Sequence, residues 1–435
     1  MNELLDRAKK VHLVGIGGSG MSAIARLLLL EGKHVSGSDR DDSKTLDELR
    51  VAGARIFVGH RSGNLPTDTD LVVHTIAVDY ENPELERAKS MNIKTMTYPE
   101  VLGLISKDKF TIAVSGTHGK TTTTAMVGKL LRDAGLDPTV IVGSRMLNPE
   151  SNLVVGKSKY LVVEACEYRR SFLNIEPNIV VITNIDRDHL DYFGDLPEIQ
   201  RAFGEFAAKL PSDGALICAA IRSRVATVKA KTKAKVIDYE LCEPLTRDFK
   251  LRLPGAHNQW NAQAAVAVAE YLNIPHGVIK KSLETFKGTK RRLEYKGKTF
   301  NDTLVYDDYG HAPSEIRATL SALRDLYPDK KITIVFQPHL YSRTRLLLGE
   351  FGGSFEEADN VIITDIFASR EPNDNSIHAK DLVSRINKNG VQKASYIEDF
   401  MSIYELMREG ELKTDILLVE GAGSVGALAD ALIKE

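Results

Sequence analysis

The chain has 435 residues, and its 57 lysines and arginines almost balance its 59 aspartates and glutamates, giving a formal net charge of −2. With 43% hydrophobic and 27% charged residues, the composition is that of an ordinary globular protein. It excludes intrinsic disorder, a collagen-like fibre or a coiled coil as a description of the whole chain. The balanced charge also creates no overall field that would attract nucleic acid or an acidic membrane surface.

Cysteine usage and hydropathy predict the compartment. Cys166, Cys218 and Cys242 are few and widely spaced, which fits neither a disulfide framework nor a zinc motif. No run approaches the ~18 apolar residues that a membrane span needs, and the opening segment MNELLDRAKK lacks the apolar core of a signal peptide. We therefore expect a cytoplasmic protein, a monomer or weak homodimer, that binds neither nucleic acid nor membrane.

Short apolar, β-branched runs alternate with helix-forming segments along the chain. They predict buried strands at 11–17, 34–39, 71–75, 110–115, 160–164, 178–184, 332–336, 360–365 and 415–420. Such continuous apolar runs are typical of a parallel sheet covered on both faces. Asn82-Pro83 and Pro313 predict helix starts, the latter helix running through Leu326, and Gly135 predicts a helix end. The pattern predicts an α/β fold.

The length suggests about three domains, at roughly 150 residues each. A second series of strands and helices opens at Phe110, and a charged stretch at 286–300 precedes a third series. We place the domains at residues 1–107, 108–290 and 291–435.

The first glycine-rich segment is GIGGSG at residues 15–20, between a predicted strand and a predicted helix. Gly15, Gly17 and Gly20 match the pattern in which the backbone approaches a pyrophosphate at a helix N-terminus. Asp39 ends the next strand, where an acid could bind ribose hydroxyls. The alternative is a tight strand-to-helix turn without a ligand. NAD and a UDP-sugar carry the same pyrophosphate, so both stay open at this point.

The second segment is SGTHGKTT at residues 115–122, again between strand and helix. It departs from the full P-loop pattern because Val114 stands at the position of the first glycine. In a P-loop, backbone N–H groups cradle phosphates, the lysine neutralises their charge and the following hydroxyl reaches Mg²⁺. We expect ATP to be bound by Gly116, Thr117, His118, Gly119, Lys120, Thr121 and Thr122.

Acidic residues follow the ends of two further predicted strands. Glu164 and Glu167 follow one, and Asp186, Asp188 and His189 follow the next. Ligands collect at the carboxyl ends of parallel strands, so these groups could hold the Mg²⁺ that bridges ATP phosphates.

Three polar segments stand out in the last third of the chain. They are the pair Arg291-Arg292, the run Asp307 to His311, and the group of His339, Tyr341, Arg343 and Arg345. Taken singly, each is equally well explained as a solvated loop. The turn Gly421 to Ser424 after the last strand has the same open interpretation.

In order, the segments GIGGSGMS, GTHGKTTTT, NIDRDHLD, AHNQWNAQAA, KRRLE, DDYGHAPSE, QPHLYSRTR and EGAGSVG resemble those of the Mur ligases, the ATP-dependent amide-bond synthetases of peptidoglycan precursor assembly. The resemblance covers nearly the whole chain. It implies an N-terminal Rossmann-like domain that binds UDP, a central P-loop ATPase domain with a mostly parallel sheet, and a C-terminal Rossmann-like α/β domain that recruits the amino acid.

The segments DDYGHAPSE and QPHLYSRT are similar to those of the family member that joins L-alanine to UDP-N-acetylmuramate. The resemblance implies that ATP phosphorylates the lactyl carboxylate, and that the amine of L-alanine then attacks the acyl phosphate and phosphate leaves. Physical chemistry agrees, because this step forces two anions together and the site must supply positive charge placed in advance.

The resemblance also assigns roles by position. UDP pyrophosphate would be held by Gly17, Gly18, Ser19 and Gly20. Magnesium would be held by Thr121, Glu164 and His189. ATP would further contact Asn258, Arg292 and Asp308. The amino acid would contact His311 and Arg343. The residues expected to act in catalysis are Lys120, His189, Arg292, His311 and Arg343.

One departure bears on specificity. The family usually reads QPHRYTRT, whereas this chain has Leu340 in place of the first arginine, which is a bidentate carboxylate anchor. Glycine or serine therefore stays open as the amino acid. The alternative within the family is a ligase that attaches a recycled tripeptide to the same nucleotide, and the segment QPHLYSRT argues against it. Alternatives outside this reaction are a folylpolyglutamate-type synthase, an NAD-dependent dehydrogenase and a non-catalytic nucleotide-gated binding module.

Overall fold

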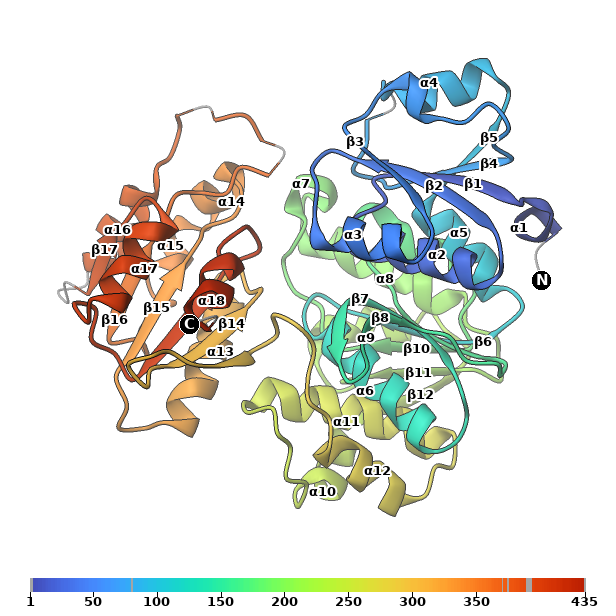
Figure 1. Cartoon of the computed structure of the whole chain (residues 1–435). Coiled ribbons are helices and arrows are strands. Elements are labelled where there is room, and N and C mark those ends of the chain that lie inside the picture. The colour runs from blue at the N-terminus through green and yellow to red at the C-terminus, as the bar shows by residue number, and fades with distance from the viewer. Residues whose placement is uncertain (1–2, 80, 370, 374, 389–392, 434–435) are drawn as a thin grey trace. The chain divides into compact units, whose positions relative to one another are not determined.

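The computed structural model describes residues 3–79, 81–369, 371–373, 375–388 and 393–433. Figure 1 shows three sheets flanked by helices along the chain. The chain divides into two compact units. One comprises the chain up to Leu251 together with Trp260–Lys287, and the other comprises Arg252–Gln259 and Gly288 onward.

The first sheet is entirely parallel, with strand order β3-β2-β1-β4-β5. Its strands are β1 Lys10–Val14, β2 His34–Asp39, β3 Arg55–Val58, β4 Leu71–His74 and β5 Lys94–Thr97. Its helices are α1 Glu3–Arg7, α2 Ser19–Leu30, α3 Lys44–Val51, α4 Pro83–Ser90 and α5 Tyr98–Ser106, with a 3₁₀ turn η1 Ser62–Asn64. Alternate residues of β1 face opposite layers, so Leu13 packs in the core with α2 and α3 while Val14 packs with α4.

The second sheet has the order β12-β11-β10-β6-β9-β7-β8, and only the β7–β8 pair is antiparallel. Its strands are β6 Phe110–Ser115, β7 Thr139–Leu147, β8 Glu150–Val154, β9 Tyr160–Glu164, β10 Ile179–Ile182, β11 Ala215–Cys218 and β12 Lys235–Asp238. Its helices are α6 Lys120–Asp133, α7 Leu190–Phe193, α8 Leu196–Ala208, α9 Ser223–Lys229, α10 Glu243–Thr246, α11 Ala256–Tyr271 and α12 His276–Glu284, with 3₁₀ turns η2 Tyr168–Asn174 and η3 Tyr239–Cys242. One continuous cluster of buried apolar residues joins this sheet to the first one.

The β7–β8 hairpin ties the two sheets of the first unit together. Asn152 on β8 is only 4% exposed, and its amide donates a hydrogen bond of 2.6 Å to the carbonyl of Ser19 in the first turn of α2. Its side-chain carbonyl accepts from Arg26, about two turns further along α2, at 2.8 Å. Arg145 on β7 and Arg26 both form ion pairs with Glu48 of α3. These contacts fix the start of α2, and with it the first glycine turn, to the second sheet.

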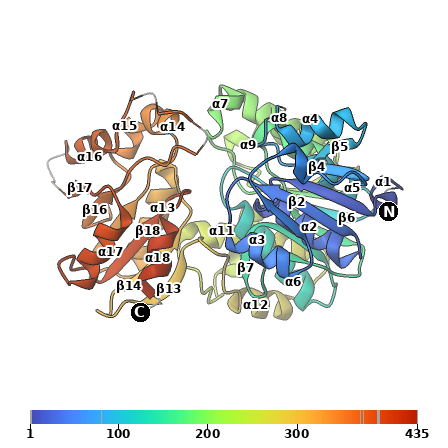
Figure 2. The same ribbon diagram turned by 45° about the horizontal axis from the view of Figure 1, so that its top comes forward.

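The third sheet forms the second unit, with the order β13-β14-β18-β15-β16-β17 and one antiparallel pair, β13–β14. Its strands are β13 Glu294–Lys298, β14 Leu304–Asp308, β15 Ile332–Phe336, β16 Asn360–Ile363, β17 Ala394–Tyr396 and β18 Ile416–Glu420. Its helices are α13 Pro313–Leu326, α14 Tyr341–Leu346, α15 Leu348–Phe351, α16 Ala379–Asn387, α17 Phe400–Arg408 and α18 Gly426–Ile433. Helices α13, α15 and α16 cover one face and α17 and α18 the other, as the tilted view in Figure 2 also shows.

The predicted α/β class with mostly parallel sheets is confirmed. Helix α13 spans Pro313–Leu326 as predicted, and α4 has Asn82 as its N-cap and Pro83 at its first position. The edge strands and the β7–β8 hairpin were not predicted. The domain boundaries 1–107, 108–290 and 291–435 stay a prediction. Within the described part of the chain, no helix has both the length and the apolar character needed to cross a membrane.

Candidate active site

The first glycine turn links β1 to α2 at the carboxyl edge of the first sheet. Gly15 has a φ of +79°, and a Cβ there would lie 2.5 Å from Thr75 Cγ2, so both conformation and space require glycine. Gly18 is the N-cap of α2 and brings no capping side chain. The first N–H groups of α2, beginning at Ser19, therefore lack a side-chain cap, which is the arrangement that binds pyrophosphate.

The structure brings Asp39 to this turn. Its Oδ2 accepts a hydrogen bond of 2.8 Å from the backbone N–H of Gly17, and its Oδ1 accepts one of 2.8 Å from Arg40. Asp39 thus holds the glycine turn in place, and its predicted contact with ribose stays a prediction.

The second glycine turn links β6 to α6. Gly119 is the N-cap of α6 with a φ of +81°, and a Cβ there would lie 2.3 Å from Asn261 Oδ1 on α11. A Cβ on Gly116, whose φ is +134°, would lie 2.0 Å from Thr183 Oγ1. Asn184 accepts from the N–H of Thr117 with its carbonyl (3.1 Å) and from that of His118 with its side chain (3.0 Å). The loop is therefore held against the end of β10.

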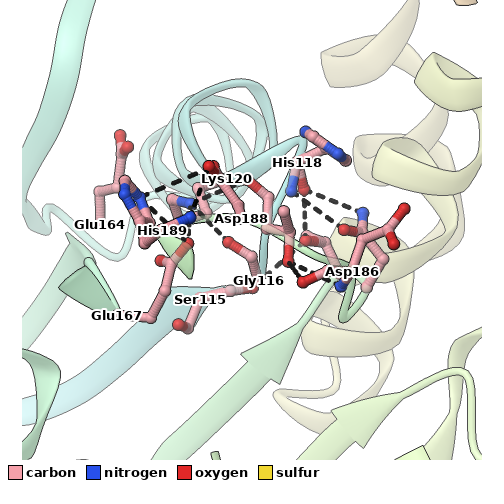
Figure 3. A network of polar contacts seen from close by, with 12 residues as sticks. Ser115, Gly116, His118, Lys120, Glu164, Glu167, Asp186, Asp188 and His189 are labelled. Carbon is pink, nitrogen blue, oxygen red and sulfur yellow. Dashed lines mark hydrogen bonds and ion pairs between the residues drawn. The ribbon is translucent and has the colours of Figure 1, made fainter. Parts of the chain in front are cut away.

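Lys120 lies at the centre of a polar network at this edge (Figure 3). Its ammonium donates to Glu167 Oε1 and to the carbonyl of Thr117, both at 3.0 Å. Burial lowers the pKa of Lys120, but the neighbouring carboxylates Glu167 and Glu164, the nearby Cys166 and the hydrogen bond to Glu167 together outweigh it, and the net effect is a raised pKa. The cation that a phosphate would need is thus permanently charged and already in position.

Thr121, the next residue of α6, donates its hydroxyl hydrogen bond to Glu164 Oε1 at 3.1 Å. The other carboxylate oxygen of Glu164 accepts from the N–H of Gly143 on β7 at 2.7 Å. Two of the three predicted metal ligands are therefore in direct contact.

His189, the third predicted ligand, lies with two further acids. Its Nε2 is 3.6 Å from Asp188 Oδ2 and 4.0 Å from Glu167 Oε1. One ligand atom from each of these three residues lies within 4.8 Å of the others, and Figure 3 shows them converging beside Lys120. Glu167 is 2% exposed and its Oε2 has no hydrogen-bond partner among the described residues. The donor set suits a divalent cation, since it offers two carboxylates and an imidazole.

The second unit carries the remaining predicted site residues. Asn258 lies on α11, and the others lie near the carboxyl edge of the third sheet. Arg291 and Arg292 behave differently there. Arg291 pairs with Asp307 at 3.2 Å and donates to the carbonyls of Gly421 and Gly423, which makes it part of the scaffold. The guanidinium of Arg292, the predicted ATP ligand, lies over the Tyr309 ring at 5.1 Å.

Asp308 is 8% exposed, and both of its carboxylate oxygens accept backbone hydrogen bonds, from Leu293 at 2.5 Å and from Gly310 at 2.7 Å. Burial raises its pKa to about 6. Glu420, its register partner on β18, is fully buried, and burial together with Asp308 raises its pKa well above the ordinary value. The predicted ribose contact of Asp308 stays a prediction.

His311 begins the segment before α13, and its ring lies 5.8 Å from that of His339. Arg343 lies on α14. This helix begins directly after its N-cap, the buried Leu340, whose φ is +68°. Asn258 on α11 is 3% exposed and donates its amide to the carbonyl of Pro254 at 2.8 Å. His311 and Arg343, the predicted amino-acid contacts, and Asn258, the predicted ATP-base contact, all belong to the second unit.

All three parts of the chain are similar to domains of known proteins. Residues 10–110 match the Mur ligase family catalytic domain, 114–247 the Mur ligase middle domain, and 291–423 the Mur ligase glutamate ligase domain. A UDP-N-acetylmuramate–L-alanine ligase from Caldanaerobacter subterraneus subsp. tengcongensis is 40% identical, over 99% of this chain and 98% of its own. The chain belongs to the Mur ligase family. The resemblance seen in the sequence motifs is therefore confirmed, and the chain is an ATP-dependent ligase.

Two further relatives agree. The enzyme of the same name from Clostridium kluyveri is 41% identical over 98% of both chains. The crystal structure of a UDP-N-acetylmuramate–alanine ligase from Thermotoga maritima superposes with a TM-score of 0.81 at 28% identity, again over 98% of each chain. Membership of this ligase family argues against the alternative that the chain is an NAD-dependent dehydrogenase.

Some contacts of this Mur ligase site could not be predicted from the sequence. Glu167 and Asp188 follow predicted strands, so their position could be seen in the sequence, but not that Glu167 pairs with Lys120. Asn261 belongs to the segment AHNQWNAQAA that carries the family resemblance, but its place at the second glycine turn, like that of Tyr98 at the first, depends on helix packing.

Proposed function

We propose that the chain joins L-alanine to the lactyl carboxylate of UDP-N-acetylmuramate in peptidoglycan precursor synthesis, with ATP converted to ADP and phosphate. The observation that carries the proposal is the similarity, at about 40% identity along the full length, to ligases of that name. The geometry supports it, since two glycine turns of one compact unit each open a helix at the carboxyl edge of a parallel sheet.

The proposed reaction explains the charge at the second turn. A lactyl carboxylate becomes an acylating agent when the γ-phosphoryl group of ATP is transferred to it. Two anions must then meet, and the side chain of Lys120 and the N–H groups at the start of α6 would stabilise them. The amine of L-alanine would attack the acyl phosphate, form the C–N bond and expel phosphate.

We propose Mg²⁺ as the cation at the acidic edge, by which we mean the carboxyl ends of β9 and β10 with Glu164, Glu167, Asp188 and His189. Thr121 and Glu164 are the ligands that the sequence predicts beside the phosphates, and His189 would contribute together with Glu167 and Asp188. The unpartnered oxygen of buried Glu167 supports a cation there. Mg²⁺ held by these residues would offset the negative charge that develops on the phosphates during transfer.

The roles of Asn258, Arg292 and Asp308 in ATP binding, and of His311 and Arg343 in amino-acid binding, remain proposals from the family resemblance. The half-buried Arg343 would bind the carboxylate of L-alanine. We also propose a cytoplasmic enzyme that is a monomer or a weak homodimer.

Incubation with ATP, Mg²⁺, UDP-N-acetylmuramate and one amino acid at a time tests the proposal, with phosphate release and product mass as readouts. L-alanine should give a product heavier than UDP-N-acetylmuramate by one alanyl residue, and glycine, serine and a tripeptide should react far more slowly. Equal turnover with alanine, glycine and serine, or none with alanine, would refute the alanine assignment. Turnover with the tripeptide alone would indicate the recycling reaction instead.

A further inference from the structure

Tyr98 occupies an unusual place at the first glycine turn. It is the first residue of α5, and the start of that helix is fixed by a capping box between Thr97 and Glu100. A Cβ built on Gly20, in the first turn of α2, would lie 2.5 Å from Tyr98 Cζ and 2.9 Å from its hydroxyl oxygen. The hydroxyl end of the ring therefore rests directly on the segment where the UDP pyrophosphate is proposed to bind.

The same helix, α5, packs on the segment between β9 and β10 of the second sheet. A Cβ on Gly103 would lie 2.4 Å from the carbonyl oxygen of Asn174 in η2, and Ser106 Oγ accepts from the N–H of Glu176 at 3.0 Å. Because α5 packs this closely on the segment that joins β9 to β10, the position of Tyr98 is fixed relative to both the glycine turn and the second sheet.

The phenol of Tyr98 is able to donate a hydrogen bond. Tyr98 is half-buried, and its hydroxyl makes no hydrogen bond to any residue that the structure describes. Burial raises the pKa of the phenol, and the charge of Glu164 raises it further, so the proton stays on the oxygen at neutral pH. Helix α5, which begins at Tyr98, packs on η2, whose N-cap is Glu167.

We propose that the Tyr98 hydroxyl donates a hydrogen bond to an oxyanion of the bound sugar nucleotide, either the lactyl carboxylate or the pyrophosphate. The inference rests on the proposed function and adds a substrate-binding residue to it. A carboxylate held next to Glu164 would otherwise meet another negative charge. A neutral donor at that point can orient the carboxylate without forming a salt bridge that lowers its nucleophilicity.

Tyr98→Phe tests the proposal, because it removes the hydroxyl and keeps the ring that packs on Gly20. Dissociation constants for UDP-N-acetylmuramate and UDP-N-acetylglucosamine, which lacks the lactyl group, are measured by titration calorimetry with the full-length chain. The loss of one hydrogen bond to a charged group should weaken binding of UDP-N-acetylmuramate by roughly 10- to 100-fold. A non-hydrolysable ATP analogue should bind the variant and the wild type equally, which also shows that the fold is intact.

Tyr160→Phe is the matched control. Tyr160 lies at the amino end of β9, the strand whose carboxyl end carries Glu164, so the same chemical change there should leave both dissociation constants unaltered. A loss for UDP-N-acetylmuramate alone identifies the carboxylate as the acceptor, and an equal loss for both nucleotides identifies the pyrophosphate.

Unchanged binding of both nucleotides by Tyr98→Phe would overturn the inference while leaving the function standing, provided that the wild type still forms UDP-N-acetylmuramoyl-alanine. Failure of the wild type to bind either nucleotide would overturn the proposed function and the inference together.

Discussion

The ion pair between Lys120 and Glu167 has two consequences that can be separated by substitution. The two side chains are 14% and 2% exposed, and the ammonium nitrogen lies 3.0 Å from Glu167 Oε1. Lys120 is therefore expected both to bind phosphate and to neutralise a buried carboxylate. Lys120→Met removes the charge and keeps most of the apolar stem.

The magnitude follows from burial. Removing one partner of a buried pair leaves an uncompensated charge and costs about 3–5 kcal/mol. Lys120 is close to fully buried but reachable by some water, so we expect a loss in the free energy of unfolding of about 3 kcal/mol, near the lower end of that range. Lys120→Met combined with Glu167→Gln replaces the stranded carboxylate by a neutral amide and should recover about 2 kcal/mol of this loss.

The assay is a double-mutant cycle with urea unfolding and phosphate release measured on the same preparations. Turnover should be lost in Lys120→Met and should stay lost in the double variant, although stability returns. If Lys120→Met unfolds at the wild-type urea concentration, or if Glu167→Gln brings no recovery, the buried ion pair does not contribute as argued.

Three further outcomes are expected. Gly119→Ala forces a side chain into a left-handed N-cap and against Asn261, so affinity for ATP should fall at least tenfold while UDP binding is kept, as calorimetry with each nucleotide would show. Asn152→Ala frees the first turn of α2 by removing the hydrogen bond to Ser19, and should raise the KM for the sugar nucleotide several-fold with kcat and the KM for ATP nearly unchanged. Glu420→Gln removes a buried acid with a raised pKa. Wild-type stability should therefore fall more steeply than that of the variant as pH rises above ~4.3, the ordinary glutamate pKa, and parallel urea-unfolding profiles would contradict this.

The parts of the site that could be predicted are those where local sequence determines local structure. The runs VHLVGIG and FTIAVS have the apolar pattern of buried strands, and glycine is required where the chain turns from strand to helix. Gly15 and Gly119 do have left-handed backbones in the structure. Glycine spacing alone therefore located both turns, although it could not decide between NAD and a UDP-sugar.

The β7–β8 hairpin could not be predicted in this way. The second half of β7 contains Gly143, Ser144 and Arg145, which interrupt the apolar pattern that marks the other strands. Its stability comes from contacts far along the chain, including those of Arg145 with Glu48 and of Asn152 with Ser19. Pairwise contacts between residues 97 and 133 positions apart leave no periodic pattern in a single sequence.

Backbone strain gives an independent reason to place function at the acidic edge. Arg169, Arg170 and His189 have φ values of +49°, +56° and +51°, where non-glycine residues are uncommon and cost of order 1–3 kcal/mol each. Glycine or asparagine would relieve that cost if these positions served only to turn the chain. Side chains are retained there instead, and Arg170 forms ion pairs with Glu198 and Glu205 that hold the turn. The strained backbone directs His189 toward Glu167 and Asp188, which is the geometry that the proposed cation needs.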